Sequence, residues 1–213
     1  MGMGKAGLLN FIRTTGEKIL LPKPFQIAMI GLDSSGKTSI LYRLKMNEFV
    51  PTAPTAAFNM ERVKLAKNTR LAIWDVGGSE NIRPLWRTYM RQADGIVFVV
   101  DSTDRKRIEE MREELCLALN ACLKERVPVL IFANKQDSHF AVDPADLTEI
   151  LELKNLKEKN PWILQASSAK TGDGVKEGYV RLVALIDERR AVPKEKASTA
   201  GSFSPTPKAS EFI

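Results

Sequence analysis

Residues Gly31 to Thr38 read G-L-D-S-S-G-K-T, a loop framed by glycine that ends in lysine and threonine. The two glycines allow the backbone to wrap closely, so that successive N–H groups can point at phosphate oxygens. Lys37 can then reach the outer phosphates, and the Thr38 hydroxyl is a hard oxygen ligand for Mg2+. The alternative is a glycine-bearing turn with a chance lysine, which the flanking strand and helix patterns argue against. The residues expected around the phosphates are Gly31, Asp33, Ser34, Ser35, Gly36, Lys37, Thr38 and Ser39.

A second candidate site begins at Asp75, which ends an apolar run and is followed by Val76, Gly77 and Gly78. A carboxylate in this position can hold Mg2+, usually through water. Gly78 offers a backbone N–H that can approach a γ-phosphate without interference from a side chain. A lone D-x-G-G sequence is more often a simple turn. Here a single predicted hairpin separates it from the phosphate loop, and this position favours a role in binding Mg2+ and phosphate.

The third motif, Asn134 to Asp137, reads N-K-Q-D and follows a buried run. The Asp137 carboxylate can accept two hydrogen bonds from guanine N1–H and the 2-amino group, a donor pair that adenine lacks. The stem of Lys135 can lie along the base, and Asn134 can tie the loop together. Further on, the backbone of Ser168, Ala169 and Lys170 is placed to contact guanine O6. The motifs together predict binding of a guanine nucleotide.

Apolar runs alternate with helical patterns along the chain, which predicts a mainly parallel sheet covered on both faces. The expected strands are 25–30, 57–65, 70–75, 95–101, 127–134 and 162–166, and the expected helices are 36–46, 82–91, 105–124, 144–153 and 173–190. The link between 57–65 and 70–75 is so short that this pair must be antiparallel. The fold class is therefore α/β, with three layers and a six-stranded, mainly parallel sheet that contains one antiparallel pair.

The net charge of +6 over 213 residues is concentrated at the two ends of the chain. Residues 1–24 and residues 189–213 each carry +3, whereas the charges of the central body cancel. This placement favours contact with an anionic membrane surface over nucleic-acid binding, with solvated tails as the alternative. We expect a domain at 24–190, an extension at 1–23 and a disordered tail at 191–213, because that tail is rich in Ser, Thr, Pro, Ala and Lys.

Nothing in the sequence points to secretion or to a membrane span. No run of 18 or more apolar residues exists, and the first residues lack a secretory pattern. Cys116 and Cys122 lie about 240° apart around a helix, so they cannot pair within it. We expect reduced thiols and a cytoplasmic protein.

The ordered motifs resemble those of the small GTPases of the Arf and Arf-like family, over roughly residues 20–190. The matching segments are Gly31–Asp33, Pro54-Thr55, Phe58-Asn59, Trp74–Gly78, Arg83–Arg87, Asn134–Asp137 and Gln165-Ala166. The resemblance implies a P-loop G domain that binds GTP, GDP and Mg2+. It also implies an exchange factor, a GTPase-activating protein and effectors as partners, and we expect a monomer.

The same resemblance assigns two switch segments, 50–59 and 77–91. Thr55 would then join Mg2+ only in the triphosphate state, and Phe58, Trp74 and Tyr89 would face effectors. The helical spacing of Ile82, Leu85, Trp86 and Tyr89 along one face agrees with such a surface. Ordinary core packing is the alternative for each of these side chains.

Two positions in the switches depart from the family pattern. Ser79 stands where the family has the glutamine that orients the attacking water, and its hydroxyl is too short to replace an amide. We therefore expect slow intrinsic hydrolysis, with Ser79, Lys37 and Thr55 as the catalytic positions. The neighbouring Glu80 is a candidate to take the place of the glutamine, but the sequence does not show in which direction its side chain points. Ala57 replaces the usual glycine and restricts the backbone there.

The first residues form an amphipathic pattern that is typical of a membrane-binding helix. Leu8, Leu9, Phe11 and Ile12 occupy an arc of about 160° on a helix, and Pro22 and Pro24 separate it from the first strand. Gly2 is a weak candidate for myristoylation, because Ala6 replaces the preferred hydroxyl residue. A helix packed permanently on the domain is the alternative.

The sequence thus predicts a GTP-binding switch that recruits effectors, with peripheral membrane association. Two other functions stay open. One is a scaffold that does not hydrolyse GTP, which Ser79 supports. The other is a P-loop ATPase or nucleotide kinase, which the Asn134–Asp137 motif argues against.

Overall fold

A computed structural model describes residues 23–120, 126–156 and 160–191, with Leu156 described by its backbone only. The predicted amphipathic extension up to residue 22, the candidate lipidation site Gly2, the second cysteine Cys122 and the tail after residue 191 lie outside these residues. Within the described ranges, no helix is long and apolar enough to cross a membrane.

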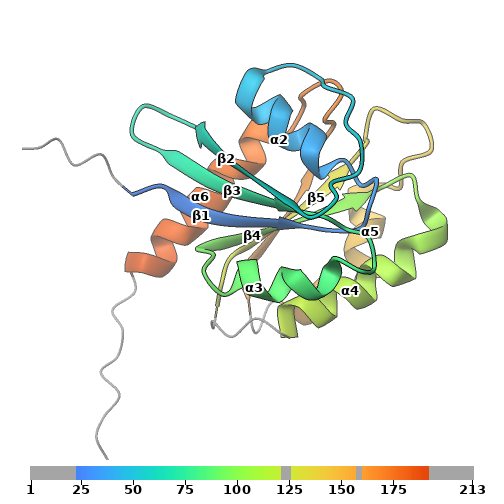
Figure 1. Ribbon diagram of the computed structural model, residues 1–213. Coiled ribbons are helices and arrows are strands. Elements are labelled where there is room, and N and C mark those ends of the chain that lie inside the picture. The colour runs from blue at the N-terminus through green and yellow to red at the C-terminus, as the bar shows by residue number, and fades with distance from the viewer. Residues whose placement is uncertain (1–22, 121–125, 157–159, 192–213) are drawn as a thin grey trace, which may run out of the picture.

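A six-stranded sheet forms the centre of the domain (Figure 1). Its strands run in the spatial order β2-β3-β1-β4-β5-β6. Only β2 and β3 pair antiparallel, and all other neighbours are parallel, as predicted. The strands are β1 (Phe25–Ile30), β2 (Phe58–Lys64), β3 (Arg70–Val76), β4 (Gly95–Asp101), β5 (Val129–Asn134) and β6 (Trp162–Ala166).

Helices cover both faces of this sheet, so the domain has three layers (Figure 1). One face packs against α2 and α6 through residues such as Leu41 and Leu182. The other face packs against α3, α4 and α5 through residues such as Met90, Leu115 and Leu147. The helices are α2 (Lys37–Met46), α3 (Trp86–Met90), α4 (Ile108–Asn120), α5 (Pro144–Ile150) and α6 (Val175–Ala191).

The observed helices are shorter than predicted where the local chemistry interrupts them. The predicted helix 82–91 begins as a 3-10 turn at Arg83–Leu85, because Pro84 removes a backbone donor and restricts the residue before it. The helix α6 begins at Val175 and not at 173, because Gly172 and Gly174 adopt left-handed backbone angles of +97° and +71°. The predicted strand ends at residues 57, 65, 127 and 128 also fall outside the paired strands.

The parallel arrangement brings the sequence motifs together at one edge of the sheet. Strands β1, β3, β4, β5 and β6 all end there, because parallel neighbours share their direction. Residues that follow the carboxyl ends of such strands form the usual ligand site of open α/β sheets. The three motifs therefore meet although more than a hundred residues separate the first from the last.

Candidate functional site

A single cavity at this edge of the sheet is lined by residues from all of the predicted motifs. The predicted nucleotide residues that line it are Asp33, Ser34, Gly36, Lys37, Thr38, Ser39, Thr55, Gly78, Asn134, Lys135, Asp137, Ala169 and Lys170, and Ser79 lines it as well. Of the residues predicted to bind the nucleotide or the metal, Gly31, Ser35, Asp75 and Ser168 are absent from the wall. They lie directly behind it, where they hold the lining residues in place.

The loop from Gly31 to Thr38 owes its shape to close backbone contacts. A side chain on Gly36 would lie 2.4 Å from the Asn134 amide nitrogen, and the backbone of Gly36 is left-handed with φ of +93°. The ammonium group of Lys37 donates to the carbonyls of Gly31 at 2.9 Å and Leu32 at 2.7 Å. These contacts keep a buried cation at the base of the loop, where an anionic ligand would be attracted.

Burial lowers the pKa of Lys37 to about 8, and the nearby Asp75 carboxylate acts in the opposite direction. The same burial raises the pKa of Asp75, which the hydrogen bond from Thr38 and the charge of Lys37 oppose. Both shifts express the cost of removing charge from water. The two groups therefore stabilise each other in their charged forms, and further charged ligands would add to that balance.

Three side-chain oxygens meet next to the loop in a way that suits Mg2+. The Thr38 hydroxyl donates to Asp75 Oδ2 at 2.6 Å and lies 2.9 Å from the Thr55 hydroxyl. The other carboxylate oxygen, Asp75 Oδ1, is buried without a hydrogen-bond partner. Hard oxygen donors around an unsatisfied carboxylate oxygen fit this cation. Among the described residues, no group of three His, Cys, Asp or Glu side chains could bind a metal ion on its own. Phosphate oxygens of a ligand would therefore have to complete the coordination of Mg2+.

The two predicted switch segments both touch the phosphate loop. A side chain on Gly78 would lie 2.3 Å from the backbone nitrogen of Asp33, so only glycine allows this approach. The Gly77 N–H donates to the Ala57 carbonyl at 2.8 Å and joins the two segments. Ala57 itself does not adopt a left-handed backbone angle, so its methyl group introduces no strain in this conformation.

The third motif is held by hydrogen bonds that reach across the cavity. The buried Asn134 amide donates to the Ser35 carbonyl at 2.8 Å and accepts from the Ala169 N–H at 3.1 Å. It therefore ties the loop after β5 to the loops after β1 and β6. Asp137 accepts a 2.6 Å hydrogen bond from the Ser168 hydroxyl, which orients its carboxylate at the cavity wall.

Lys135 adopts the left-handed conformation, with φ of +68°. Its ammonium group pairs with Asp101 at the end of β4. The same carboxylate accepts hydrogen bonds from the backbone N–H and the hydroxyl of Thr103, at 2.9 Å and 2.6 Å. The pairing fixes the head of the lysine, so that its aliphatic stem forms part of the cavity wall.

Sequence reasoning missed two side chains that belong to the site. Phe49 lines the cavity and is 45% exposed. Arg43 of α2 donates to the Ala169 carbonyl at 3.0 Å and to the Lys170 carbonyl. These contacts hold the loop that follows β6 against α2. An isolated phenylalanine after the polar end of a helix was the one available signal for Phe49. Arg43 gave none, because its partners are more than 120 residues away.

Ser79 and Glu80 face different hollows of the surface. Ser79 lines the cavity with Gly78, and its hydroxyl is the first side-chain group after that glycine. Glu80 lines a second hollow between α3 and α4 and is absent from the cavity wall. In this conformation the Glu80 side chain therefore does not form part of the cavity wall beside Gly78.

The predicted aromatic surface is present in part. Phe58, Trp74 and Tyr89 form a cluster with ring-centroid distances of 5.1 to 6.0 Å. Phe58 is 49% exposed and Leu85 is 40% exposed, whereas Ile82 is half-buried. The prediction for Trp86 is wrong for this conformation, because it is buried in the core and its indole N–H donates to the Gly77 carbonyl at 2.8 Å. Helical spacing alone could not separate this inward ring from its outward neighbours.

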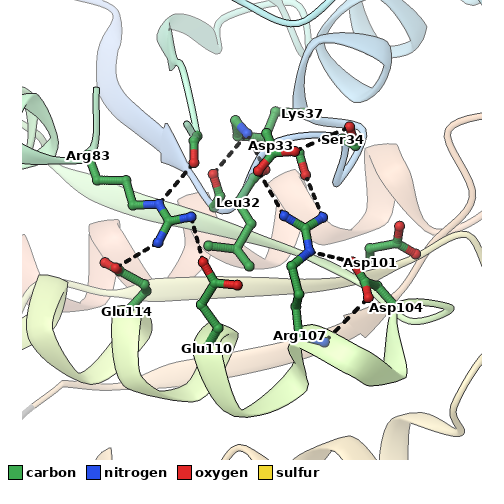
Figure 2. Close-up of polar contacts among 12 residues, drawn as sticks. Leu32, Asp33, Ser34, Lys37, Arg83, Asp101, Asp104, Arg107, Glu110 and Glu114 are labelled. Atoms are coloured by element: carbon green, nitrogen blue, oxygen red, sulfur yellow. Dashed lines mark hydrogen bonds and ion pairs between the residues drawn. The ribbon is translucent and has the colours of Figure 1, made fainter. Parts of the chain in front are cut away.

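Two arginines anchor the phosphate site to the adjoining helix α4 and the turn that precedes it (Figure 2). Arg107 pairs with Asp33 of the phosphate loop at 2.8 Å and with Asp104 at 2.6 Å. Burial acts to raise the pKa of Asp33, but the hydrogen bond and the charge of Arg107 outweigh it and the pKa lies below its usual value. Arg83 connects the Gly78 carbonyl to Glu110 and Glu114. The helix α4 and the turn before it thus hold both the phosphate loop and the second switch segment through these two arginines.

Comparisons with known proteins agree with this geometry. ADP-ribosylation factor-like protein 4A from Homo sapiens is 44% identical over 176 residues, which cover 81% of this chain and 88% of that protein. The protein of the same name from Mus musculus gives the same values. Among solved structures, the Arl6 (BBS3) small GTPase from Trypanosoma brucei, with bound nucleotide analogue GppNp, is 34% identical with a TM-score of 0.71. That match covers 78% of this chain and 99% of the other. The model of the ADP-ribosylation factor family matches residues 12–186, and the chain therefore belongs to this family of small GTP-binding switches.

Proposed function

We propose that this chain is an Arf-like switch whose intrinsic GTP hydrolysis is slow and whose GTP form recruits effectors at a membrane surface. The observation that carries the proposal is the side chain next to Gly78. In this place the cavity holds only the short hydroxyl of Ser79, and the neighbouring Glu80 faces another hollow. The experiment that tests it is hydrolysis after restoration of the longer amide side chain.

The phosphates of GTP or GDP would lie in the loop from Gly31 to Thr38, against its backbone N–H groups and Lys37. Thr38, Thr55 and Asp75 would hold Mg2+, which supplies positive charge that neutralises the phosphate oxygens. The Gly78 N–H would bind the γ-phosphate. Thr55 and Gly78 belong to the two switch segments, so a triphosphate would hold both segments and a diphosphate would release them.

The guanine base would bind beside the third motif. The Asp137 carboxylate, already oriented by Ser168, would accept from N1–H and the 2-amino group. The stem of Lys135 and the ring of Phe49 would cover the base, and the backbone around Ala169 would face O6. An adenine base would leave the carboxylate without donors, which is a costly mismatch in a partly buried site.

Hydrolysis requires a group that orients the attacking water next to Gly78. A serine hydroxyl ends two bonds short of a glutamine amide and cannot donate and accept across the same gap. Lys37 and Thr55 would still stabilise charge on the phosphate. The chain would therefore bind GTP well and hydrolyse it slowly until a GTPase-activating protein supplies the missing group.

Effectors would bind the cluster of exposed Phe58 and half-buried Trp74 and Tyr89, together with exposed Leu85 and half-buried Ile82. The cluster lies on β2, β3 and α3, next to both switch segments, so its shape depends on them. Exposed aromatic groups supply much of the binding energy in protein interfaces. An exchange factor would act on the same segments, and we expect a monomer with no role in nucleic-acid binding.

Membrane association is proposed from the sequence of the two ends and from the family. The excess positive charge lies there, and Leu8, Leu9, Phe11 and Ile12 form one apolar arc. A helix of this kind lies in the interface plane and is attracted by anionic lipids. We propose a cytoplasmic protein that binds membranes peripherally, with acylation of Gly2 as an added anchor.

A second candidate function is a scaffold that stays bound to GTP without hydrolysing it. Ser79 favours this function too, because loss of a water-orienting group can cost several orders of magnitude in rate. Turnover over hours in the presence of Mg2+ separates the two. Measurable release of phosphate supports the cycling switch, and its complete absence supports the scaffold.

Asp137→Asn tests the base contact. The asparagine side chain would place an N–H donor against guanine N1–H and the 2-amino group, which are donors themselves. We therefore expect the affinity for GDP to fall about a hundredfold. Competition between fluorescent GDP and unlabelled GDP or ATP measures this. The control is Asp173→Asn, the same change at an exposed carboxylate in a neighbouring loop. An equal effect of the two substitutions would contradict the assignment.

Removal of Mg2+ tests the oxygen cluster. EDTA should speed release of GDP from the native chain, and Asp75→Asn should reduce the effect of EDTA about tenfold, because it weakens the metal site. Stopped-flow fluorescence of a labelled nucleotide records both rates, with Asp173→Asn again as control. Release that does not respond to EDTA in the native chain would exclude a role for the metal in nucleotide retention.

Ser79→Gln tests the hydrolysis proposal. The longer amide can donate and accept at the attacking water, so we expect single-turnover hydrolysis to accelerate by about tenfold or more. Glu80→Gln is the matched control, since its side chain faces the other hollow and the rate should stay unchanged. If Ser79→Gln hydrolyses GTP no faster than the native chain, residue 79 does not limit the rate.

Flotation with anionic liposomes tests membrane binding. The full chain loaded with a non-hydrolysable GTP analogue should float with vesicles that contain phosphatidylserine. Phe11→Glu places a charge within the apolar arc and should abolish flotation, whereas Asn10→Glu adds the same charge opposite the arc and should weaken it only slightly. Native protein that remains in the soluble fraction would rule out the proposed membrane role.

A further inference from the structure

Arg83 lies between the loop that contains Gly78 and the helix α4, and its side chain joins the two (Figure 2). Its Nε donates to the Gly78 carbonyl at 3.0 Å. Its two terminal nitrogens donate to Glu114 at 2.8 Å and to Glu110 at 2.7 Å. The side chain is only 10% exposed. One planar cation therefore satisfies the loop on one edge and two carboxylates of a rigid helix on the others.

Two consecutive peptide planes of this loop are fixed by side chains. The Gly77 carbonyl accepts from the Trp86 indole, and the Gly78 carbonyl accepts from Arg83. In a trans peptide the N–H points away from the C=O of the same plane. Trp86 therefore sets the direction of the Gly78 N–H, and Arg83 sets the direction of the Ser79 N–H.

The restraint matters because the loop has little stiffness of its own. Gly77 and Gly78 are neighbouring glycines, which can adopt many backbone conformations. Gly78 also packs so closely on the phosphate loop that a side chain on it would lie 2.3 Å from the Asp33 nitrogen. Trp86 holds the peptide plane before Gly78 and Arg83 holds the plane after it, so the backbone of Gly78 is restrained from both sides. Release of either plane would let the loop shift and would change the distance from the Gly78 N–H to a bound γ-phosphate. Donors held in place before the ligand arrives stabilise its charge without a cost of reorganisation.

We propose that Arg83 is a positioning residue for recognition of the γ-phosphate, since it ties the Gly78 carbonyl to Glu110 and Glu114 of α4. The inference rests on the proposed contact between the Gly78 N–H and the γ-phosphate. A diphosphate has no γ-phosphate that could accept a hydrogen bond from the Gly78 N–H. The tether therefore raises affinity for GTP and leaves affinity for GDP nearly unchanged, so that it sets the preference between the two nucleotides.

Arg83→Met in the full-length chain tests this, because methionine keeps much of the apolar stem and removes every donor. Affinities for GDP and for the non-hydrolysable analogue GppNHp are measured by competition in magnesium buffer. We expect the affinity for GppNHp to fall about tenfold, as for loss of a hydrogen bond to a charged group, and the affinity for GDP to stay within about twofold. If Arg83 has a purely structural role, the substitution should lower the affinities for both nucleotides equally. That result would overturn the proposal.

Three further variants keep the test decisive. Arg87→Met, at an exposed arginine of α3 four residues further on, should leave the ratio of affinities unchanged. Arg83→Lys and the double variant Glu110→Gln with Glu114→Gln should both shift the ratio against GppNHp, and they carry the test if Arg83→Met does not fold. If the ratio of GppNHp to GDP affinity is unchanged in these variants, the inference about Arg83 is wrong, whereas the proposed function is unaffected. A native chain that fails to bind GppNHp would contradict the proposed function itself.

Discussion

The buried amide of Asn134 is the contact on which the rest of the site depends. It donates to the Ser35 carbonyl and accepts from the Ala169 N–H, so one side chain joins the loops that follow β1, β5 and β6. The amide also occupies the space in which a side chain on Gly36 would lie. Because both polar ends of a buried amide must be satisfied, the three loops can keep only a small range of relative positions. The phosphate region and the base region are thereby fixed to one another before any ligand binds.

Charge is arranged around this frame so that each buried group has a partner nearby. Lys37 is held by two carbonyls and faces the Asp75 carboxylate, while Asp33 is held by Arg107 from the turn that precedes α4. Burial disfavours the charged form of both Lys37 and Asp75, and each opposes the shift of the other. A site of this kind is well suited to a ligand that carries several negative charges together with a divalent cation.

The two switch segments differ in how they are attached. The second segment is tethered to the core by Trp86 and to α4 by Arg83. The first segment meets the phosphate loop mainly through the hydroxyls of Thr55 and Thr52, which contact Thr38 and Ser39 at 2.9 Å and 3.3 Å. Contacts between neutral hydroxyl groups are worth less than hydrogen bonds to a guanidinium. In this conformation the first segment is therefore held by weaker side-chain contacts than the second.

The sequence by itself determined the class of fold and most of the site. Alternating strands and helices predicted the three layers, and the short link at residues 66–68 predicted the antiparallel pair, because these features depend on local periodicity and chain length. The glycine-framed loop, Asp75 and the Asn134–Asp137 motif were identified by spacing that phosphate and guanine chemistry requires. Only the tertiary structure placed Trp86 in the core, directed Glu80 away from the cavity and revealed Arg43 and Phe49 as parts of the site, with Arg83 as the link from Gly78 to α4. Their roles depend on partners distant in the chain or on which face of a short helix is covered, and no local pattern records such long-range packing.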